Sequence, residues 1–326
     1  MGLHTISNEW QIPGLRVRKP CLGRNIRLVR AVTVSRFGGP EAIEITELPR
    51  PTPGPGQVRI RVGAAALNPV DAAIRAGVFG GEGERLGLGW DVAGTIEALG
   101  AEVDWEVGER VMGLATGHRE PLGTHADYVV LDADAIAPSP VSLDDVQAAT
   151  LPLNTLSAFQ SLEMLALSPG QNLLVTGAAG AVGGHVVELA HRYGLEITAM
   201  ASPSDEPFLL SRGADHFLSR GANPPLASFA GVLDAAGLGR SALNAVRHGG
   251  SYVGLWPGQE PEPERGVRVG ALDVQANGAQ LAALSRLADQ GGLVARVAQT
   301  YPLEEAAAAH ARLAEGRLRG RLVLVP

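Results

Sequence analysis

The sequence predicts an α/β protein that combines a barrel-like β domain with a doubly wound parallel sheet. Three observations lead to this fold class. Short strands separated by turn residues fill positions 30–145, strands and helices alternate beyond position 165, and a glycine-rich loop joins the first of these later strands to a helix. At 326 residues the chain is long enough for both parts.

The first part is expected to consist of short antiparallel strands. Prolines and glycines crowd the segment 49–56, and because they continue neither a strand nor a helix, this segment is a turn-rich connector. Short β-rich runs bounded by such turn residues are typical of a barrel. Strands are expected at 29–34, on both sides of the connector within 43–62, and at 93–98, 110–114 and 126–131.

The second part begins with a helical stretch at 144–165. Alternation of strands with helices follows, which is the pattern of a parallel sheet covered by helices on both faces. A helix at 303–315 and a strand at 321–325 come after it. The alternating strands are expected at 172–176, 196–201, 231–235 and 251–255, and the helices at 182–193 and 206–212.

Composition argues against several classes of protein. The formal net charge is −7, whereas a nucleic-acid partner requires clustered Lys and Arg. No apolar run approaches the roughly 18 residues that cross a bilayer. A single cysteine, Cys21, cannot form an intramolecular disulfide, so a cytoplasmic localisation is expected. Residues 1–28 lack the pattern of the rest and are expected to be a disordered N-terminal extension.

The strongest local signal is the glycine-rich loop after the strand at 172–176. Gly177 permits a tight turn, Gly180 lets the backbone approach a diphosphate, and Gly183 permits close packing of helix against strand. The free amides and the dipole of the helix then favour an anion, although a purely structural turn is the alternative. The predicted cofactor-binding residues of the loop are Gly177, Ala178, Gly180, Ala181, Val182 and Gly183.

The residues after the next strand bear on the choice of cofactor. A loop that prefers NAD carries an acid about 20 residues on for the ribose 2′-hydroxyl, but here the strand ends at Ser202 without one. Ser202 and Ser204 are suited to hydrogen-bond a 2′-phosphate. Asp205 and Glu206 would repel it, and the following turn holds no Lys or Arg. NADPH is favoured, and NADH is not excluded.

Several short motifs occur in one fixed order along the chain. They are NPVD at 68–71, GWDVAG at 89–94, VGERV at 107–111, GTHADY at 123–128 and RGRLVL at 319–324. In this order, and together with the glycine loop, they resemble the medium-chain dehydrogenase/reductase superfamily and within it the NADPH:quinone oxidoreductase (zeta-crystallin-like) branch. The resemblance extends from Val29 to Pro326.

The resemblance implies how the chain is divided. A GroES-like catalytic domain is expected at 29–147 and 275–326, and a Rossmann nucleotide-binding domain at 148–274, with the active site in the cleft between them. A homodimer joined through the nucleotide domains is also implied. Zinc-dependent relatives carry Cys at the position of Asn68 and His-Glu at that of Trp90-Asp91, so the site is expected to hold no metal.

The same resemblance points to individual site residues. Asn68 is the candidate catalytic residue, as a hydrogen-bond donor to the developing oxyanion, and capping of the turn before Pro69 is the alternative. Ser157 matches a position near the nicotinamide end of the cofactor, and helix capping or packing is the alternative. Gly254 and Leu255 match a strand end that lines the cofactor. Arg319 or Arg321 could close over the cofactor, although solvation at the surface is the expected state of either.

Other polar residues are expected to be structural. Asp71 and Arg75, four residues apart, are predicted to form an ion pair on one helical face. Asp91 is predicted to be a buried structural carboxylate. His118 and His125 are expected to be solvated or bonded to backbone rather than catalytic.

Together these features predict a zinc-free oxidoreductase that transfers hydride from NADPH to a quinone or another activated carbonyl acceptor. An enoyl or enone reductase is one alternative, and an NADPH-binding sensor or structural protein without turnover is another. Quinone reductases often carry Tyr where this chain has Ala72-Ala73-Ile74, so that helix offers no tyrosine proton donor and quinone specificity stays open.

Overall fold

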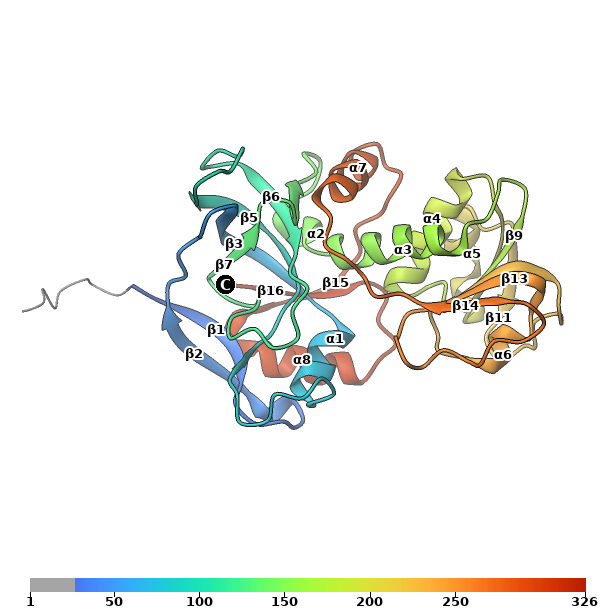
Figure 1. The fold of residues 1–326 in the computed structure, drawn as a ribbon, viewed down its shortest axis with the longest axis horizontal. Helices are drawn as coiled ribbons and strands as arrows, with labels where there is room; N and C mark the ends of the chain where they lie inside the picture. Colours follow the sequence, from blue (N-terminus) through green and yellow to red (C-terminus); the bar gives the residue numbers. More distant parts are fainter. Residues whose placement is uncertain (1–26) are drawn as a thin grey trace, which may run out of the picture.

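A computed structural model describes residues 27–326 (Figure 1). The predicted N-terminal extension therefore lies almost wholly outside the described residues. Within them, the chain forms two lobes, one built around β1–β8 and β16 and the other around β9–β14, with helix α3 (Pro152–Leu165) between them. No helix in this part of the chain is long and apolar enough to span a membrane.

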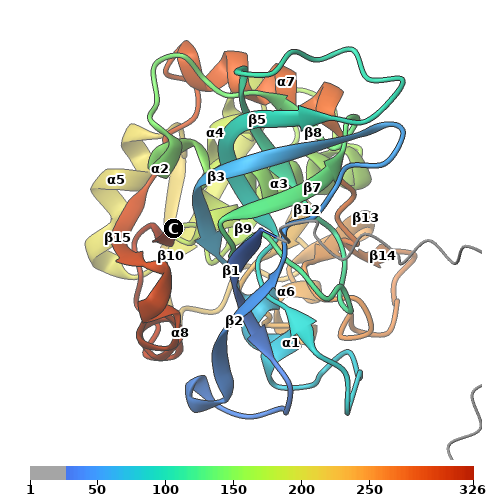
Figure 2. The same ribbon diagram turned by 90° about the vertical axis from the view of Figure 1, so that its left-hand side faces the viewer.

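The first lobe contains two sheets (Figure 2). Its smaller sheet has the order β2-β1-β4 and consists of β1 (Leu28–Val34), β2 (Ile43–Pro49) and β4 (Leu86–Gly87). Its larger sheet has the order β15-β16-β3-β5-β6-β8, and β7 pairs with β3 off this path. These strands are β3 (Gln57–Leu67), β5 (Asp91–Leu99), β6 (Arg110–Leu114), β7 (Tyr128–Asp132), β8 (Ile136–Pro138), β15 (Val297–Pro302) and β16 (Arg321–Val325).

All pairings in this lobe are antiparallel except that of β15 with β16, which is parallel. An isolated bridge between Ala31 and Ala126 connects the two sheets. The predicted barrel-like β domain is thus confirmed, with the C-terminal strand β16 placed next to β3.

The second lobe is a six-stranded sheet in which every pairing is parallel. The strand order runs outward from the β9–β12 pair in both directions, so the topological switch point lies between these two strands. Ligands bind outside the carboxyl ends of strands at such a point. In order, the strands are β11 (His216–Ser219), β10 (Glu196–Ala201), β9 (Asn172–Thr176), β12 (Phe229–Asp234), β13 (Val246–Gly254) and β14 (Arg268–Ala271).

Helices cover the sheets and join the lobes. The predicted helix at 144–165 is in fact two helices, because Pro152 has no amide hydrogen and starts a new helix at its first position. The remaining helices and the short 3₁₀ turns complete the fold. They are α1 (Pro69–Arg75), α2 (Asp145–Ala148), α4 (Ala181–Arg192), α5 (Glu206–Ser211), α6 (Arg240–Leu243), α7 (Gly278–Asp289), α8 (Ala306–Ala314), η1 (Pro40–Ala42), η2 (Pro203–Asp205) and η3 (Leu303–Glu305).

One hydrophobic core continues through both lobes. The largest cluster of buried apolar side chains includes Leu67 and Trp90 from the first lobe and Leu173 and Val175 from the second. Leu156 of α3 belongs to the same cluster. Packing therefore fixes the two lobes against each other through α3, and the loops at their junction are held in place.

Candidate active site

The glycine-rich loop has the geometry that its sequence predicts. Gly177 has a φ of +60°, and Gly180 is the N-cap of α4. A Cβ on Gly183 would lie 2.9 Å from the Cα of Ala178 and would clash with the Gly177 carbonyl oxygen, so only glycine fits. The loop folds tightly over the first turn of α4 and leaves the amides of that turn without helical acceptors.

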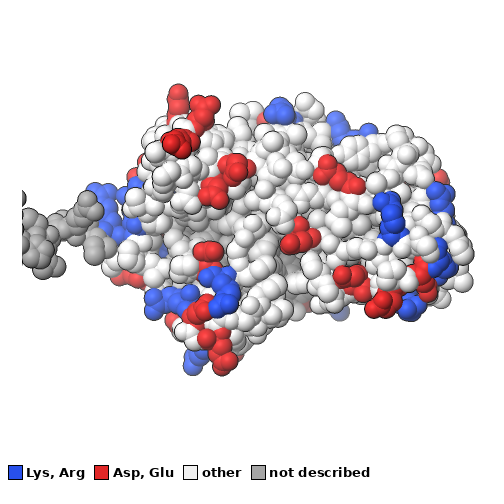
Figure 3. All heavy atoms as spheres, viewed as in Figure 1, with Lys and Arg blue, Asp and Glu red and all other residues white. Residues whose placement is uncertain are grey.

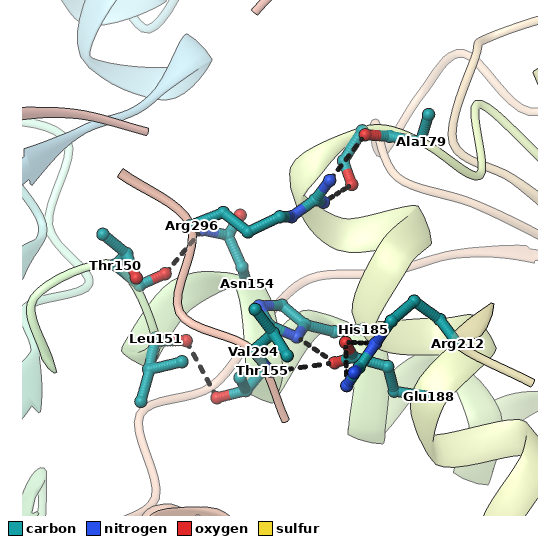
Figure 4. Close-up of polar contacts among 11 residues, drawn as sticks. Thr150, Leu151, Asn154, Thr155, Ala179, His185, Glu188, Arg212, Val294 and Arg296 are labelled. Atoms are coloured by element: carbon teal, nitrogen blue, oxygen red, sulfur yellow. Dashed lines mark hydrogen bonds and ion pairs between the residues drawn. The ribbon is translucent and has the colours of Figure 1, made fainter. Parts of the chain in front are cut away.

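A side chain from the far end of the chain fixes this loop (Figure 4). Arg296 precedes β15 and donates from Nη1 to the carbonyl of Ala179 (3.1 Å) and from Nη2 to that of Gly180 (2.7 Å). Its guanidinium also lies over the ring of Phe208, 4.9 Å from the centroid. Burial lowers the pKa of Arg296, but an arginine keeps its charge in proteins.

A buried carboxylate anchors the same segment to α4. Glu188 accepts hydrogen bonds from Nδ1 of His185 (2.9 Å), Nε of Arg212 (2.8 Å) and the amide of Val294 (3.4 Å) (Figure 4). Burial alone would raise the pKa of Glu188, yet the hydrogen bond from His185 and the charge of Arg212 lower it below its ordinary value. The carboxylate of Glu188 therefore connects three parts of the structure: helix α4, Arg212 at the end of α5, and the segment before β15.

A small hollow lies at the junction of the lobes, beside the first turn of α4. Its polar walls come from α3, α4 and the two segments that lead into β15 and β16. The residues that line it are Thr150, Asn154, Ala181, His185, Arg296, Gly320 and Arg321. Of these, only Ala181 was predicted as a site residue outright. Ser157 lies one turn after Asn154 on α3 and is buried.

A buried polar cluster stands behind this hollow. Asn68 is fully buried, and its Nδ2 donates to Oδ2 of Asp91 (2.8 Å) and to the Ala66 carbonyl (3.3 Å). Nη2 of Arg321 donates to Oδ1 of Asn68 and to the carbonyl of Leu67. Both ends of the Asn68 side chain are thus engaged within the protein, and Arg321, not Asn68, lines the hollow.

Two carboxylates share this cluster. Asp71 accepts from the amides of Asn68 (2.6 Å) and Gly89 (3.0 Å), and Asp91 accepts from the amide of Leu153 (2.6 Å). Burial raises the pKa of Asp71 to about 7 and that of Asp91 to about 6, although the hydrogen bonds and Arg321 oppose the shift. The prediction that Asp91 is a buried structural carboxylate agrees with these contacts.

Two predictions about this cluster are wrong. Asp71 does not pair with Arg75, because Asp71 turns to the backbone amides while Arg75 donates to the Gly38 carbonyl (3.2 Å) and contacts Nδ1 of His310 (3.1 Å). Arg321 is not solvated at the surface: it is 7% exposed, and its Nε has no partner among the described residues. His125, as predicted, contacts backbone, from Nε2 to the Ala66 carbonyl (3.2 Å).

A basic side chain from the C-terminal segment reaches the carboxyl end of β10. Arg319 donates from Nη2 to Oγ of Ser204 (2.7 Å), and its Nε lies 2.7 Å from Oδ1 of Asp205. Arg220 follows the adjacent strand β11, and its amide donates to the carbonyl of Ala201 (2.6 Å). The local sequence lacks a basic residue in the turn after β10, but the fold supplies Arg319 from the C-terminal segment.

Comparisons with known proteins agree with this architecture. Residues 54–141 match the family described as "Alcohol dehydrogenase GroES-like domain", and residues 212–324 match "Zinc-binding dehydrogenase". A quinone oxidoreductase of Pseudomonas aeruginosa is 30% identical, with 92% of this chain and 100% of that protein covered. The chain belongs to the medium-chain dehydrogenase/reductase superfamily, in its zeta-crystallin-like quinone oxidoreductase branch.

Further relatives fit the same superfamily. A 2-methylene-furan-3-one reductase of Solanum lycopersicum is 32% identical over 83% of this chain and 72% of that protein. The structure of the quinone oxidoreductase from Coxiella burnetii superposes with a TM-score of 0.80 at 26% identity, covering 92% of this chain and all of that one. The chain is therefore an oxidoreductase of the medium-chain superfamily, whose members depend on NAD or NADP.

The residues of this medium-chain oxidoreductase fit a dinucleotide on structural grounds. The close packing at Gly183 holds the glycine loop against the first turn of α4. The buried Nε of Arg321, in the hollow that Ala181 also lines, has no hydrogen-bond partner among residues 27–326. Gly254 and Leu255 lie at the carboxyl end of β13. Next to them, Asp234 ties the strand ends together by accepting from Thr176 Oγ1 (2.6 Å) and Tyr252 Oη (2.8 Å).

Asn68 and Trp90 stand where the family resemblance implies metal ligands in zinc-dependent relatives. Nε1 of Trp90 donates to the Gly117 carbonyl (3.0 Å). Within residues 27–326, no group of three or more His, Cys, Asp or Glu side chains is arranged to hold a metal ion. Cys21 lies outside the described residues.

Proposed function

We propose that this oxidoreductase transfers hydride from NADPH to a quinone or another activated carbonyl acceptor without a metal ion. The observation that carries the proposal is the glycine-rich loop at the switch point of the parallel sheet, where the first turn of α4 and Arg321 both line a small hollow at the junction of the lobes. Bound NADPH supplies the hydride, and an electron-poor acceptor takes it without strong prior activation.

The protein's own part is to bind, orient and exclude water. The loop amides of Ala181 and Val182 would hold the diphosphate of the cofactor, whereas the amide of Ala178 already donates to the Met200 carbonyl (3.1 Å). Ser157 on α3 and Gly254–Leu255 at the end of β13 would line the nicotinamide end. Asn68 has no free side-chain group to offer an oxyanion, because its amide is bonded to Asp91 and Arg321. In this proposal it would act as a positioning residue that fixes Arg321 at the hollow.

Preference for NADPH over NADH rests on the end of β10. Ser202 and Ser204 follow that strand, and Arg319 already donates to Ser204 (2.7 Å). The repulsion expected from Asp205 is reduced because Arg319 pairs with its carboxylate at 2.7 Å. A 2′-phosphate at this place would meet the guanidinium group of Arg319.

Reduction of an α,β-unsaturated carbonyl compound is the second candidate. The similarity to a 2-methylene-furan-3-one reductase favours it, since an enone accepts hydride at carbon with the same cofactor and the same donor geometry. A small enone is favoured over a long acyl carrier. On the face shown in Figure 3, basic and acidic side chains are interspersed instead of forming one basic entry.

The test follows oxidation of NADPH and of NADH in parallel, with a chelator present. The acceptors are 1,4-benzoquinone, phenanthrenequinone and a short enone. NADPH-dependent quinone turnover that survives chelation supports the proposal, and turnover with the enone alone selects the second candidate. Silence with every acceptor, together with measurable NADPH binding, would leave a binding protein without turnover. We further propose a cytoplasmic homodimer that binds neither nucleic acid nor membrane.

A further inference from the structure

Arg296 stands in an electrostatically unfavourable place. Its guanidinium contacts the carbonyls of Ala179 and Gly180, at the start of α4, where the helix dipole presents positive charge. A second buried guanidinium, that of Arg321, lines the same hollow, and its Nε has no hydrogen-bond partner within the part of the chain that the structure describes. Each guanidinium also faces carboxylates, Glu188 and Asp205 for Arg296 and Asp91 and Asp71 for Arg321. The positive N-terminus of α4 is therefore the part of the hollow that an added anion would complement.

The contacts of Arg296 also determine where the loop amides point. A peptide group is planar and trans, so its carbonyl and its N–H point in opposite directions. When Arg296 holds the carbonyl of Gly180 (2.7 Å), it therefore orients the N–H of Ala181, the next residue. Ala181 is the first residue of α4, so this N–H has no helical acceptor, and Ala181 lines the hollow.

The segment that carries Arg296 is firmly held on both sides. Two residues before it, the amide of Val294 donates to Glu188 (3.4 Å), and after it the chain enters β15 of the first lobe. The backbone carbonyl of Arg296 accepts from the amide of Arg321 (2.7 Å), where β16 begins. Arg296 thus connects the glycine loop of one lobe to the strands of the other.

We propose that Arg296 is a positioning residue for the cofactor's diphosphate: by clamping the carbonyls of Ala179 and Gly180, it holds the glycine loop and orients the amide of Ala181, the first residue of α4. This inference rests on the proposed function, because it takes the anion to be a nicotinamide dinucleotide. The diphosphate is common to NADPH, NADH and ADP-ribose. The clamp therefore acts equally on all three, unlike the contacts of Arg319 and Ser204.

The test measures dissociation constants by calorimetry for NADPH, NADH and ADP-ribose. R296M removes both hydrogen bonds and is expected to weaken all three ligands by the same factor, about tenfold, the value of one or two lost charge-assisted hydrogen bonds. R296K keeps the charge but lacks the planar fork, so it is expected to recover only part of the loss. R286Q, on the exposed face of α7, is the matched control for loss of one positive charge.

Three outcomes would overturn the clamp. R296M could bind all three ligands as tightly as R286Q does, it could lose affinity for NADPH alone, or R296K could bind as the unaltered protein does. If R296K binds as the unaltered protein does, the positive charge of residue 296 alone accounts for the affinity, and the two hydrogen bonds to the loop carbonyls do not. If the unaltered protein binds none of the three ligands, the proposed function fails instead.

Hydrogen exchange tests the clamp without any ligand. In R296M the amides of residues 178–184 are expected to exchange faster, while those of the neighbouring strand β9 keep their protection. Unchanged exchange in 178–184 would overturn the proposal even if binding is lost. Faster exchange throughout β9 as well would show that R296M disturbs the fold. In that case the exchange of residues 178–184 is compared between R296K and the unaltered protein.

Discussion

Asn68 illustrates how a residue's role depends on its partners. The prediction that it donates to an oxyanion requires a free amide, yet its Nδ2 is used by Asp91 and its Oδ1 by Arg321. Its backbone amide in turn donates to Asp71 (2.6 Å). An asparagine is suited to this position because it both donates and accepts, and so connects a carboxylate with a guanidinium.

The raised pKa of Asp91 predicts a pH-dependent stability. Burial raises its pKa from 3.8 to about 6, so the folded state holds this proton more tightly than the unfolded state does. Its contribution to the free energy of unfolding is full below pH 4 and is lost as the pH rises through 6. Between pH 4 and 7, D91N is expected to gain stability relative to the unaltered protein by up to about 3 kcal/mol, measured by urea denaturation.

In the matched control, D289N, the stability is expected to change with pH in the opposite direction. Asp289 accepts from the amides of Ser142 (2.9 Å) and Val141 (3.2 Å), and these hydrogen bonds lower its pKa. Its contribution is therefore present above its ordinary pKa and is lost as the pH falls. D289N is expected to lose stability relative to the unaltered protein as the pH rises, and the same trend in both variants would contradict the assignment for Asp91.

Arg319 predicts a change in cofactor preference. In R319A the guanidinium that contacts Ser204 is gone and the carboxylate of Asp205 is left without its partner. We expect kcat/KM for NADPH to fall about tenfold while that for NADH stays within twofold, since only the former has a 2′-phosphate. R317A, another exposed arginine two residues away, is the control. If kcat/KM falls equally with NADPH and NADH, Arg319 does not contact the 2′-phosphate.

At the scale of elements, the close packing in the first turn of α4 makes NADPH binding sensitive to one added methyl group at position 183. In G183A the new Cβ would lie 2.9 Å from Ala178 Cα and clash with the Gly177 carbonyl, both backbone atoms that move only if the loop moves. We expect NADPH binding to weaken by at least tenfold, with unfolding at a lower temperature. In G270A the nearest atom is the flexible end of Met164, at 3.3 Å, so this strand glycine is the control. Equal binding by the two variants would contradict the close approach.

The elements that the sequence predicts well are those with a strong local pattern. Strands 110–114, 172–176, 196–201 and 321–325 are found with the predicted bounds, because each is a β-rich run next to a clear turn. Helix α7 was missed although Asn277 caps it and Leu281, Leu284 and Ala288 face the core at helical spacing. The four-residue strands β11 and β14 were also missed, since four partly exposed residues at a sheet edge carry no periodic signal.

At the scale of the whole molecule, what the sequence could not predict is contact between distant segments. The glycine loop is local, so its turns follow from neighbouring residues. Arg296 reaches the loop across 116 residues, and Arg321 reaches Asn68 across 253. The same limit explains the wrong ion pair between Asp71 and Arg75. Helical spacing brings them within reach, but packing gave each a different partner.

The continuous core predicts how the molecule unfolds. The largest buried cluster contains side chains of both lobes, and α3 contributes to it from the middle, so neither lobe can unfold without exposing the apolar surface of the other. We expect one calorimetric transition. NADP⁺ at 100 times its Kd should stabilise the folded state by about 2.7 kcal/mol, which raises the transition by about 5 °C. Because both lobes wall the hollow, the whole transition should shift. Two separate transitions, or a shift confined to part of the heat absorption, would show that the cofactor stabilises one lobe alone.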